Sequence, residues 1–411
     1  MSNTNNKATL PWYFRALVVL YAFHSTLPIL GFNTPAVVHA ANMALLYGFL
    51  FIKEGRTALS DFAKIIPIFA IHILSILYKG FGNIAVELYW LLQLMVYPLL
   101  SLYLIRIGDQ RSAKRLVVIL GLSFIVTSIT TYFGCRAYPG ASRDLAAMLS
   151  TRDPALYALY MSLNIGSFSF IYALVLLLPL LVFAIKEKLV YRWIGLAVLA
   201  IVVMAIIVSD YTTALLCMTV SIIILFVSPR RLKTIHFVLM AVLIFVLILA
   251  SDWLIVPFLD KLGGIVGREI VSDRLQELSA LSSNESSFLE GDMEARSDLY
   301  MKSINSFLDS PVWGSSSAKL GGHSYVLDNM GQFGLLGLIG MIIVFRAIFK
   351  RFFAPFKQQK FYGHILFSFL VAILLALLNP KDYLTVLTFY IPLFCVAFSD
   401  TTEYEDTLDC Q

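Results

Sequence analysis

The feature that most constrains this chain is a series of apolar segments, each long enough for a helix to cross a bilayer. A helix needs about 20 apolar residues to cross roughly 30 Å of hydrocarbon. Backbone polar groups cannot stay unpaired in lipid, and the alternating pattern of barrel strands does not occur, so the sequence predicts an all-α polytopic membrane protein. We expect about twelve transmembrane helices, at 12–30, 34–52, 62–78, 84–105, 116–134, 157–184, 193–208, 211–228, 235–257, 325–347, 361–378 and 382–399.

Basic residues alternate from one connection to the next in the way that sets membrane orientation. Every second connection is basic, and most of the others are short and nearly uncharged. Lysine and arginine favour the cytoplasmic side, so we expect a multi-pass protein of the cytoplasmic (inner) membrane with both termini cytoplasmic. The basic connections contain Lys53, Arg56, Arg106, Arg111, Lys114, Arg115, Lys186, Lys188, Arg192, Arg230, Arg231, Lys233, Arg346, Lys350, Arg351, Lys357 and Lys360.

Composition and charge argue against several other classes. Hydrophobic residues make up 59% of the chain and charged residues only 14%, which is far from the balance of a soluble domain. The net charge of +5 is spread along one membrane edge, so the bilayer is an expected partner and nucleic acid is not. Of four cysteines, only Cys135 falls in an outward loop, so neither a disulfide framework nor a metal site is expected. Residues 1–15 lack the pattern of a cleaved signal peptide, so we expect an uncleaved anchor.

Two longer connections are predicted to face outward from the single transmembrane domain, 1–411. The smaller is 135–156, and the larger is 258–322, between the ninth and tenth spans. A loop of that length is usually functional. Within it, 272–282 and 290–311 have the pattern of amphipathic helices on the membrane surface, and the second would align Tyr300, Ile304 and Phe307 with Leu308 on one face.

His323 stands where this loop enters the tenth span, and two interpretations are open. An interfacial histidine can simply anchor a helix among lipid headgroups. Alternatively, it can act as a general base. A position in the first turn of a helix disfavours the imidazolium, which would keep the ring neutral and able to accept a proton near pH 7.

Arginines on the outward side are the second group of candidates. They suit phosphate because the guanidinium group stays charged and can make two parallel hydrogen bonds. Ordinary salt bridges are the alternative explanation for each of them. The glycines at 331, 334, 337 and 340 indicate close helix packing, and we assign them no chemistry. The outward arginines are Arg136, Arg143, Arg268, Arg274 and Arg296.

Weaker candidates are polar residues near span ends, which could line a pocket. Asp328 follows His323 by five residues, which is too far round a helix for the two to face each other directly. The remaining histidines are scattered singly and are expected to be structural. The pocket candidates are Asp210, Tyr211, Glu87, Asn164 and Asp328, and the remaining histidines are His24, His39, His72, His236 and His364.

The segment "HSYVLDNMGQFGLLG" resembles the signature of the O-antigen ligase and Wzy-type O-antigen polymerase superfamily. In that family a histidine followed by Asn or Ser introduces an aromatic residue and a leucine, and then Gly-x-x-Gly. The residues here that match are His323, Ser324, Tyr325, Leu327, Gly334 and Gly337, with Arg296, Pro311 and Gly314 upstream. Two positions depart from the usual pattern: Ser324 stands where Asn is commoner, and Tyr211 stands where an arginine is often found.

The resemblance implies a metal-independent, GT-C-like glycosyltransferase with no cofactor that uses undecaprenyl-diphosphate-linked glycans. The expected reaction joins repeat units of O-antigen, capsule or exopolysaccharide at the outer face of the cytoplasmic membrane, with inversion at the anomeric carbon. His323 would be the base, and a chain-length regulator is a further implied partner. Diphosphate contacts would come from Arg296, Arg136, Arg143, Arg274 and Arg268, and the pocket would include Tyr300, Tyr211 and Ser324.

Two other functions compete with repeat-unit polymerisation. An O-antigen ligase would transfer the finished polymer to the lipid A core, and the sequence does not separate it sharply from a polymerase. A lipid-linked-sugar flippase or transporter would fit the number of spans. A transporter would also require charged or polar residues deep within its membrane spans and internal repeat symmetry, and we find neither in the sequence.

Overall fold

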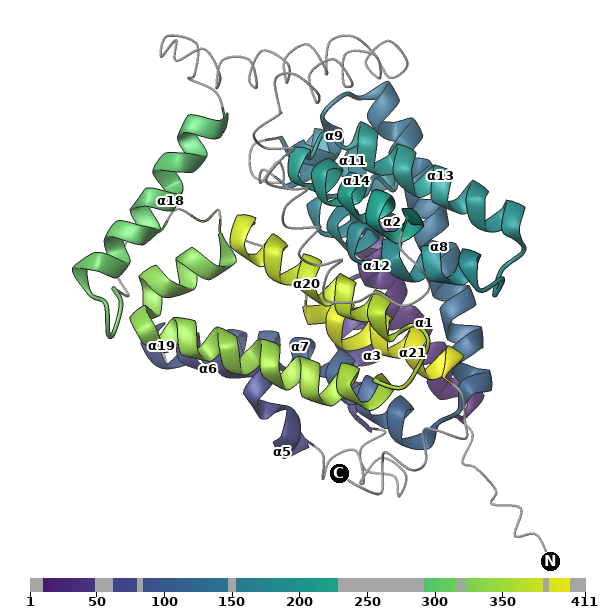
Figure 1. Ribbon diagram of the computed structural model, residues 1–411. Helices are drawn as coiled ribbons and strands as arrows, with labels where there is room; N and C mark the ends of the chain where they lie inside the picture. Colours follow the sequence, from purple (N-terminus) through teal and green to yellow (C-terminus); the bar gives the residue numbers. More distant parts are fainter. Residues whose placement is uncertain are drawn as a thin grey trace, which may run out of the picture.

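The computed structural model describes residues 10–48, 62–79, 84–146, 153–227, 292–315, 320, 322, 324–379 and 384–399. These residues form helices joined by turns and contain no strand (Figure 1). The helices are α1 (Trp12–Thr26), α2 (Pro28–Asn33), α3 (Ala36–Gly48), α5 (Phe62–Ile65), η2 (Ile66–Phe69), α6 (Ala70–Lys79), α7 (Ile84–Ile107), α8 (Gln110–Ala137), α9 (Ala141–Ala146), α11 (Pro154–Ser162), α12 (Phe168–Lys186), α13 (Arg192–Val208), α14 (Thr212–Val227), α18 (Asp292–Asp309), α19 (Tyr325–Ile348), η5 (Phe349–Phe353), η6 (Ala354–Phe356), α20 (Tyr362–Leu378), η7 (Val386–Tyr390) and α21 (Ile391–Phe398).

Helix length and composition agree with a helical membrane protein. Four continuous helical stretches are long and apolar enough to cross a bilayer: Val86–Ile107, Gln110–Ala137, Phe168–Lys186 and Tyr325–Phe356. Shorter apolar helices include α13 and α20. The all-α membrane class is therefore confirmed, whereas the count of spans remains a prediction. The span expected at 235–257 lies outside the described residues.

Helix α8 has the polarity expected of a helix in lipid. It buries the hydroxyl side chains Ser123, Thr127, Ser128 and Thr131 and exposes apolar ones, with Phe133 64% exposed. A helix at the surface of a soluble domain does the opposite. The buried hydroxyls reach neighbouring segments: the Thr127 hydroxyl donates to the carbonyl of Thr26 at 2.8 Å. We infer that hydroxyl groups, rather than apolar side chains alone, join α8 to the bundle.

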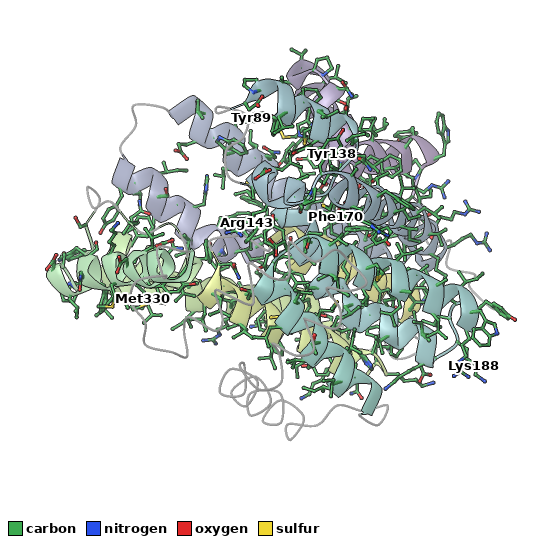
Figure 2. All side chains as sticks on the ribbon, turned by 90° about the horizontal axis from the view of Figure 1, so that it is seen from above. Tyr89, Tyr138, Arg143, Phe170, Lys188 and Met330 are labelled. Atoms are coloured by element: carbon green, nitrogen blue, oxygen red, sulfur yellow. The ribbon has the colours of Figure 1, made fainter. Side chains whose placement is uncertain are left out.

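The connections between helices gather at two ends of the bundle. At the first, which we call the basic end, the Leu10 amide donates to Asp109, Gln110 to Ser399, and Lys186 to the carbonyl of Leu225. Figure 2 shows Lys188, beside α12 at this end, and Met330 of α19 on opposite sides of the molecule. These contacts join the start of α1 and the end of α21 to the start of α8, and the end of α12 to the end of α14.

Asp109 caps α8 at the basic end. Its carboxylate accepts hydrogen bonds from the amides of Ser112 at 3.0 Å and Leu10 at 2.9 Å. Burial alone would raise the pKa of Asp109, but the hydrogen bonds from Ser112 and Leu10 and the charge of Arg15 together lower it. The carboxylate thus helps to hold the start of α1 against α8.

The span predicted at 157–184 is confirmed from Phe168 onward as α12, but its start is wrong, because the chain leaves the helical conformation between α11 and α12. Asn164 has a φ of 56°, and the amide of Gly166 donates to the Thr131 hydroxyl at 2.7 Å. The amides of Asn164 and Ile165 still bond to carbonyls of α11, but that of Gly166 bonds to α8 instead. Residues 135–156 also differ from a simple loop: α8 extends to Ala137, so Cys135 is buried in a helix.

Helix α18 confirms the helix predicted at 290–311, but the face it buries differs from the expected apolar one. It packs on the first part of α19, at the side of the molecule (Figure 1). Among the side chains described in this helix, Ser303 and Ser306 are buried, Tyr300, Ile304 and Phe307 are half-buried, and Leu308 is 63% exposed. Small residues allow the two helices to approach closely, since a Cβ on Gly331 would lie 2.8 Å from the carbonyl oxygen of Ser303. The helix expected at 272–282 lies outside the described residues.

Candidate functional site

The site is built around the start of α19. Ser324 is the N-cap of this helix, and its hydroxyl accepts a hydrogen bond from the Leu327 amide at 3.1 Å. His323 lies outside the described residues, although its neighbours Gly322 and Ser324 are described. The sequence predicts position 323 in the first helical turn. Because α19 begins at Tyr325, this position instead precedes the N-cap. The argument from the helix dipole for a neutral ring is correspondingly weaker.

The segment after His323 is fixed to the end of α20. The last carbonyls of a helix have no partner within it and need other donors. Three donors meet this need: the Ser324 hydroxyl binds the carbonyl of Leu377 at 2.7 Å, the Tyr300 hydroxyl that of Leu378 at 2.9 Å, and the Tyr325 amide that of Asn379 at 2.8 Å. Tyr300 and Ser324, predicted to line a pocket, are thus both at the site and hold its framework together.

Asp328 is closer to the site than its spacing in the sequence suggested. Its carboxylate accepts hydrogen bonds from the Ser303 hydroxyl at 2.6 Å and from the amides of Gly322 and Ser324, each at 3.2 Å. The chain before α19 folds back over the first turn, and this return cannot be read from helical periodicity. One side chain thereby joins α18, α19 and both neighbours of His323.

The turn that follows α18, residues 310–315, packs against the glycines of α19. Gly334 has φ 61° and ψ −141°, which breaks the helix into two segments at a sharp bend. The Leu335 amide at this bend donates to the carbonyl of Pro311 at 2.8 Å, and the Ser315 amide donates to the carbonyl of Gly331 at 3.1 Å. Close packing, expected for these glycines, is confirmed at Gly331, and Gly334 serves in addition to bend the helix.

A second part of the site is the turn between α13 and α14. Asp210 has a φ of 61° in this turn, and the Tyr211 hydroxyl donates to the carbonyl of Ser142 at 2.8 Å. A guanidinium nitrogen of Arg143, from α9, lies 3.9 Å from the Asp210 carboxylate. An arginine therefore reaches the turn that contains Tyr211. The side chain of Arg143 is one-third exposed.

The two parts of the site are joined through aromatic side chains. The ring of Tyr211 lies 5.9 Å from that of Tyr172, and the ring of Phe168 packs against both, 5.3 Å from Tyr211 and 4.4 Å from Tyr172. The Tyr172 hydroxyl reaches the side-chain oxygen of Asn379 at 3.4 Å. Since Asn379 also accepts the Tyr325 amide, a continuous set of contacts runs from Arg143 to the start of α19.

The other predicted arginines are not brought to this set of contacts. Arg136 donates to the Tyr132 hydroxyl on its own helix at 3.1 Å and lies over that ring. Arg268 and Arg274 lie outside the described residues. Arg296 belongs to α18, but its side chain is not described. The structure therefore brings together Arg143, Tyr211, Tyr300 and Ser324 from the predicted set.

The histidines are not all isolated, contrary to the prediction. The rings of His24 and His39 stack at 3.8 Å between α1 and α3, with Tyr21 on the other side of His39. His72 lies 3.9 Å from Glu87. Among the described residues, no group of three or more His, Cys, Asp or Glu side chains could hold a metal ion.

No family model and no curated protein matches this chain.

Proposed function

We propose that this protein is an integral membrane glycosyltransferase that polymerises oligosaccharide repeat units carried on undecaprenyl diphosphate. One observation carries the proposal: the segment that resembles the polymerase and ligase signature is fixed to the end of α20, and a series of contacts through Tyr172 and Asn379 links it to the turn that Arg143 reaches. A cation for diphosphate and the neighbours of a histidine are then parts of one structure within an apolar bundle. The proposal includes a location at the outer face of the cytoplasmic membrane.

The chemistry needs few groups. A sugar bonded to diphosphate already has a good leaving group, so the enzyme must stabilise the charge that develops on the phosphate and remove a proton from the attacking hydroxyl. Arg143 would contribute to the first task, with Arg296, Arg268 and Arg274 as further candidates. His323 would perform the second. The hydroxyl would attack the anomeric carbon on the side opposite the diphosphate. The new glycosidic bond would form as the bond between that carbon and the diphosphate oxygen breaks, so the configuration at the anomeric carbon would be inverted.

One partner of Arg143 is a carboxylate with which a diphosphate would compete. The 3.9 Å separation from Asp210 and the partial exposure of both side chains describe a weak ion pair. A diphosphate carries more charge than one carboxylate and can form bidentate bonds with a guanidinium group. We therefore expect a substrate to compete successfully for Arg143.

The test is reconstitution of purified protein with lipid-linked single repeat units. We expect a ladder of polymers with inverted linkages, and His323→Ala should reduce its rate by roughly 100-fold or more. His72→Ala is the matched histidine control and should retain the rate. A normal ladder from His323→Ala would contradict the base assignment.

The same assay separates the competing functions. Products attached to lipid A core, formed only when that acceptor is supplied, would indicate a ligase. Movement of the lipid-linked sugar across vesicles, without any new glycosidic bond, would indicate a flippase.

A further inference from the structure

The connection between α12 and α13 carries a continuous run of exposed side chains at the basic end. All seven residues from Lys188 to Ile194 are exposed, and we call them the 188–194 patch. Figure 2 shows Lys188 at the edge of the molecule. Tyr191 and Trp193 are each 69% exposed, which is unusual for large aromatic side chains. The exposed aliphatic residues beside them are Leu189, Val190 and Ile194. A contiguous apolar surface of this kind indicates a site of interaction.

Two cations lie within the same run, and the patch contains no acidic residue. The side chain of Lys186, just before it, donates to the carbonyl of Leu225 and so takes part in helix packing. The side chains of Lys188 and Arg192, by contrast, form no hydrogen bond or ion pair with another described residue. Their charge is therefore available to a partner outside the chain.

Lys188 has a backbone conformation that does not favour lysine. Its φ is 56°, and α12 ends here in a Schellman turn, in which the Leu189 amide donates to the carbonyl of Ala184 at 2.9 Å and the Lys188 amide to that of Ile185 at 3.3 Å. The left-handed position of such a turn is usually glycine. The other described non-glycine residues with a positive φ are an asparagine and an aspartate, which tolerate this conformation better. The turn itself therefore does not explain the lysine.

Arg192 is also placed against the local preference. It is the first residue of α13, a helix of 17 residues, whose N-terminus carries the positive end of the helix dipole. An aspartate or glutamate would be favourable in this first turn, yet the turn contains none. Neither cation of the patch is thus explained by the backbone that carries it. An anion bound at the patch would account for both.

The surroundings of the patch indicate the source of this anion. Its apolar side chains continue the outward face of α13, an apolar helix on which Ala197 and Ala200 are also exposed. Aromatic and cationic side chains together are typical of the level of the lipid headgroups, where a ring spans the boundary between hydrocarbon and water and a cation meets phosphate. The alternation of charges predicts that this connection is cytoplasmic, and the cytoplasmic leaflet is rich in anionic lipids.

We propose that the 188–194 patch binds the headgroup phosphate of anionic phospholipids. Lys188 and Arg192 contact the phosphate, and Tyr191 and Trp193 lie at the boundary between the headgroups and the acyl chains. The inference goes beyond the proposed function and does not depend on it, because it requires only that the chain is in a bilayer.

The test measures quenching of Trp193 fluorescence by brominated lipids in phosphatidylcholine vesicles that contain the full-length protein. The signal of Trp193 is obtained, for the wild type and for each variant, as the difference between forms with and without Trp193→Phe. Brominated phosphatidylglycerol, the anionic probe, is compared with brominated phosphatidylcholine at the same mole fraction. Soluble glycerol phosphate is then added, because it should not displace a lipid whose acyl chains are held in the bilayer.

Three variants separate the patch from the charge of the whole protein and from folding. Lys188→Gly and Arg192→Gln each remove one cation of the patch. Lys302→Gln is the matched control, because it removes one exposed cation from α18, which packs on α19 away from the patch. Lys188→Gly should keep or raise the melting temperature in detergent, since glycine suits a φ of 56°. Weaker lipid binding by this variant could then not result from poorer folding.

We expect the wild type to be quenched more strongly by the anionic probe than by phosphatidylcholine. Lys188→Gly and Arg192→Gln should each lower the relative affinity for phosphatidylglycerol roughly fivefold, and Lys302→Gln should leave it unchanged. Equal quenching of the wild type by the two probes, or an unchanged preference in both patch variants, would overturn the proposal. Displacement of the anionic lipid by glycerol phosphate would assign the patch to soluble anions and overturn it as well. A lower melting temperature of Lys188→Gly with the lipid preference retained would assign the lysine to the fold instead.

Discussion

Gly334→Ala tests how the bend in α19 is formed. The glycine has φ 61° and ψ −141°, a conformation that residues with a side chain rarely adopt. An added Cβ would also lie 2.5 Å from the carbonyl oxygen of Pro311, 2.6 Å from the carbonyl carbon of Val312 and 2.7 Å from the amide nitrogen of Gly314. These are backbone atoms, so none of them can move aside by changing rotamer.

The magnitude follows from two contributions. A non-glycine residue in such a conformation costs of order 1–3 kcal/mol. Forcing an extra methyl group into packed atoms costs about 1–3 kcal/mol more. We therefore expect Gly334→Ala to lower the free energy of unfolding by roughly 2–6 kcal/mol.

The assay is reversible unfolding in mixed micelles with increasing denaturing detergent, with Gly121→Ala as the control. Gly121 lies inside α8, and no atom is within 4 Å of the position its Cβ would take. Alanine there should be neutral or stabilise the protein by about 0.5–1 kcal/mol. Equal stabilities for the two variants would refute the account of the bend.

Three further predictions concern the site and the basic end. Arg143→Gln should lower the rate of polymerisation roughly tenfold or more, whereas Arg136→Gln, which changes an arginine bound to its own helix, should not; equal effects in the kinetic assay would contradict the assignment. Because the pKa of Asp109 is lowered in the folded protein, its contribution to stability is present above the ordinary aspartate value of about 4 and is lost as pH falls through the folded pKa. Asp109→Asn should therefore reduce the melting temperature at pH 7 and show a smaller further loss on acidification; parallel pH curves would argue against this. Ser324→Ala should destabilise the protein by about 1 kcal/mol or more through loss of the cap, and Ser324→Asn should retain the cap; detergent unfolding of both variants would show whether the order is correct.

The sequence was sufficient for the membrane class because the length of an apolar segment directly reflects bilayer thickness. It also predicted α18, whose acidic start and terminal proline are local signals. It could not predict the break between α11 and α12, because the groups that replace the helical bonds of Gly166 come from Thr131, 35 residues away. Apolar patterning alone does not distinguish a continuous helix from an interrupted one.

At the site, sequence patterns located Ser324 and Tyr300 but did not reveal what they bind. Their partners are carbonyls of α20, which carry no sequence signal. The spacing predicts that Asp328, a pocket candidate, faces away from His323, yet the chain before α19 turns back toward its carboxylate. The glycine pair at 321–322 is a local sequence feature that favours such a turn, and Gly322 has a φ of 71°.

The arrangement of α8 has a practical consequence for protein engineering. In a soluble protein, surface residues can usually be exchanged freely while the interior must be preserved by size. Here the outward positions Val118, Leu122 and Phe133 are the ones that demand a hydrocarbon solvent, and the inward Thr127 and Thr131 already have hydrogen-bond partners. Substituting polar residues at these exposed positions of α8, while keeping its buried hydroxyl residues, would be the first step toward a variant that stays soluble without detergent.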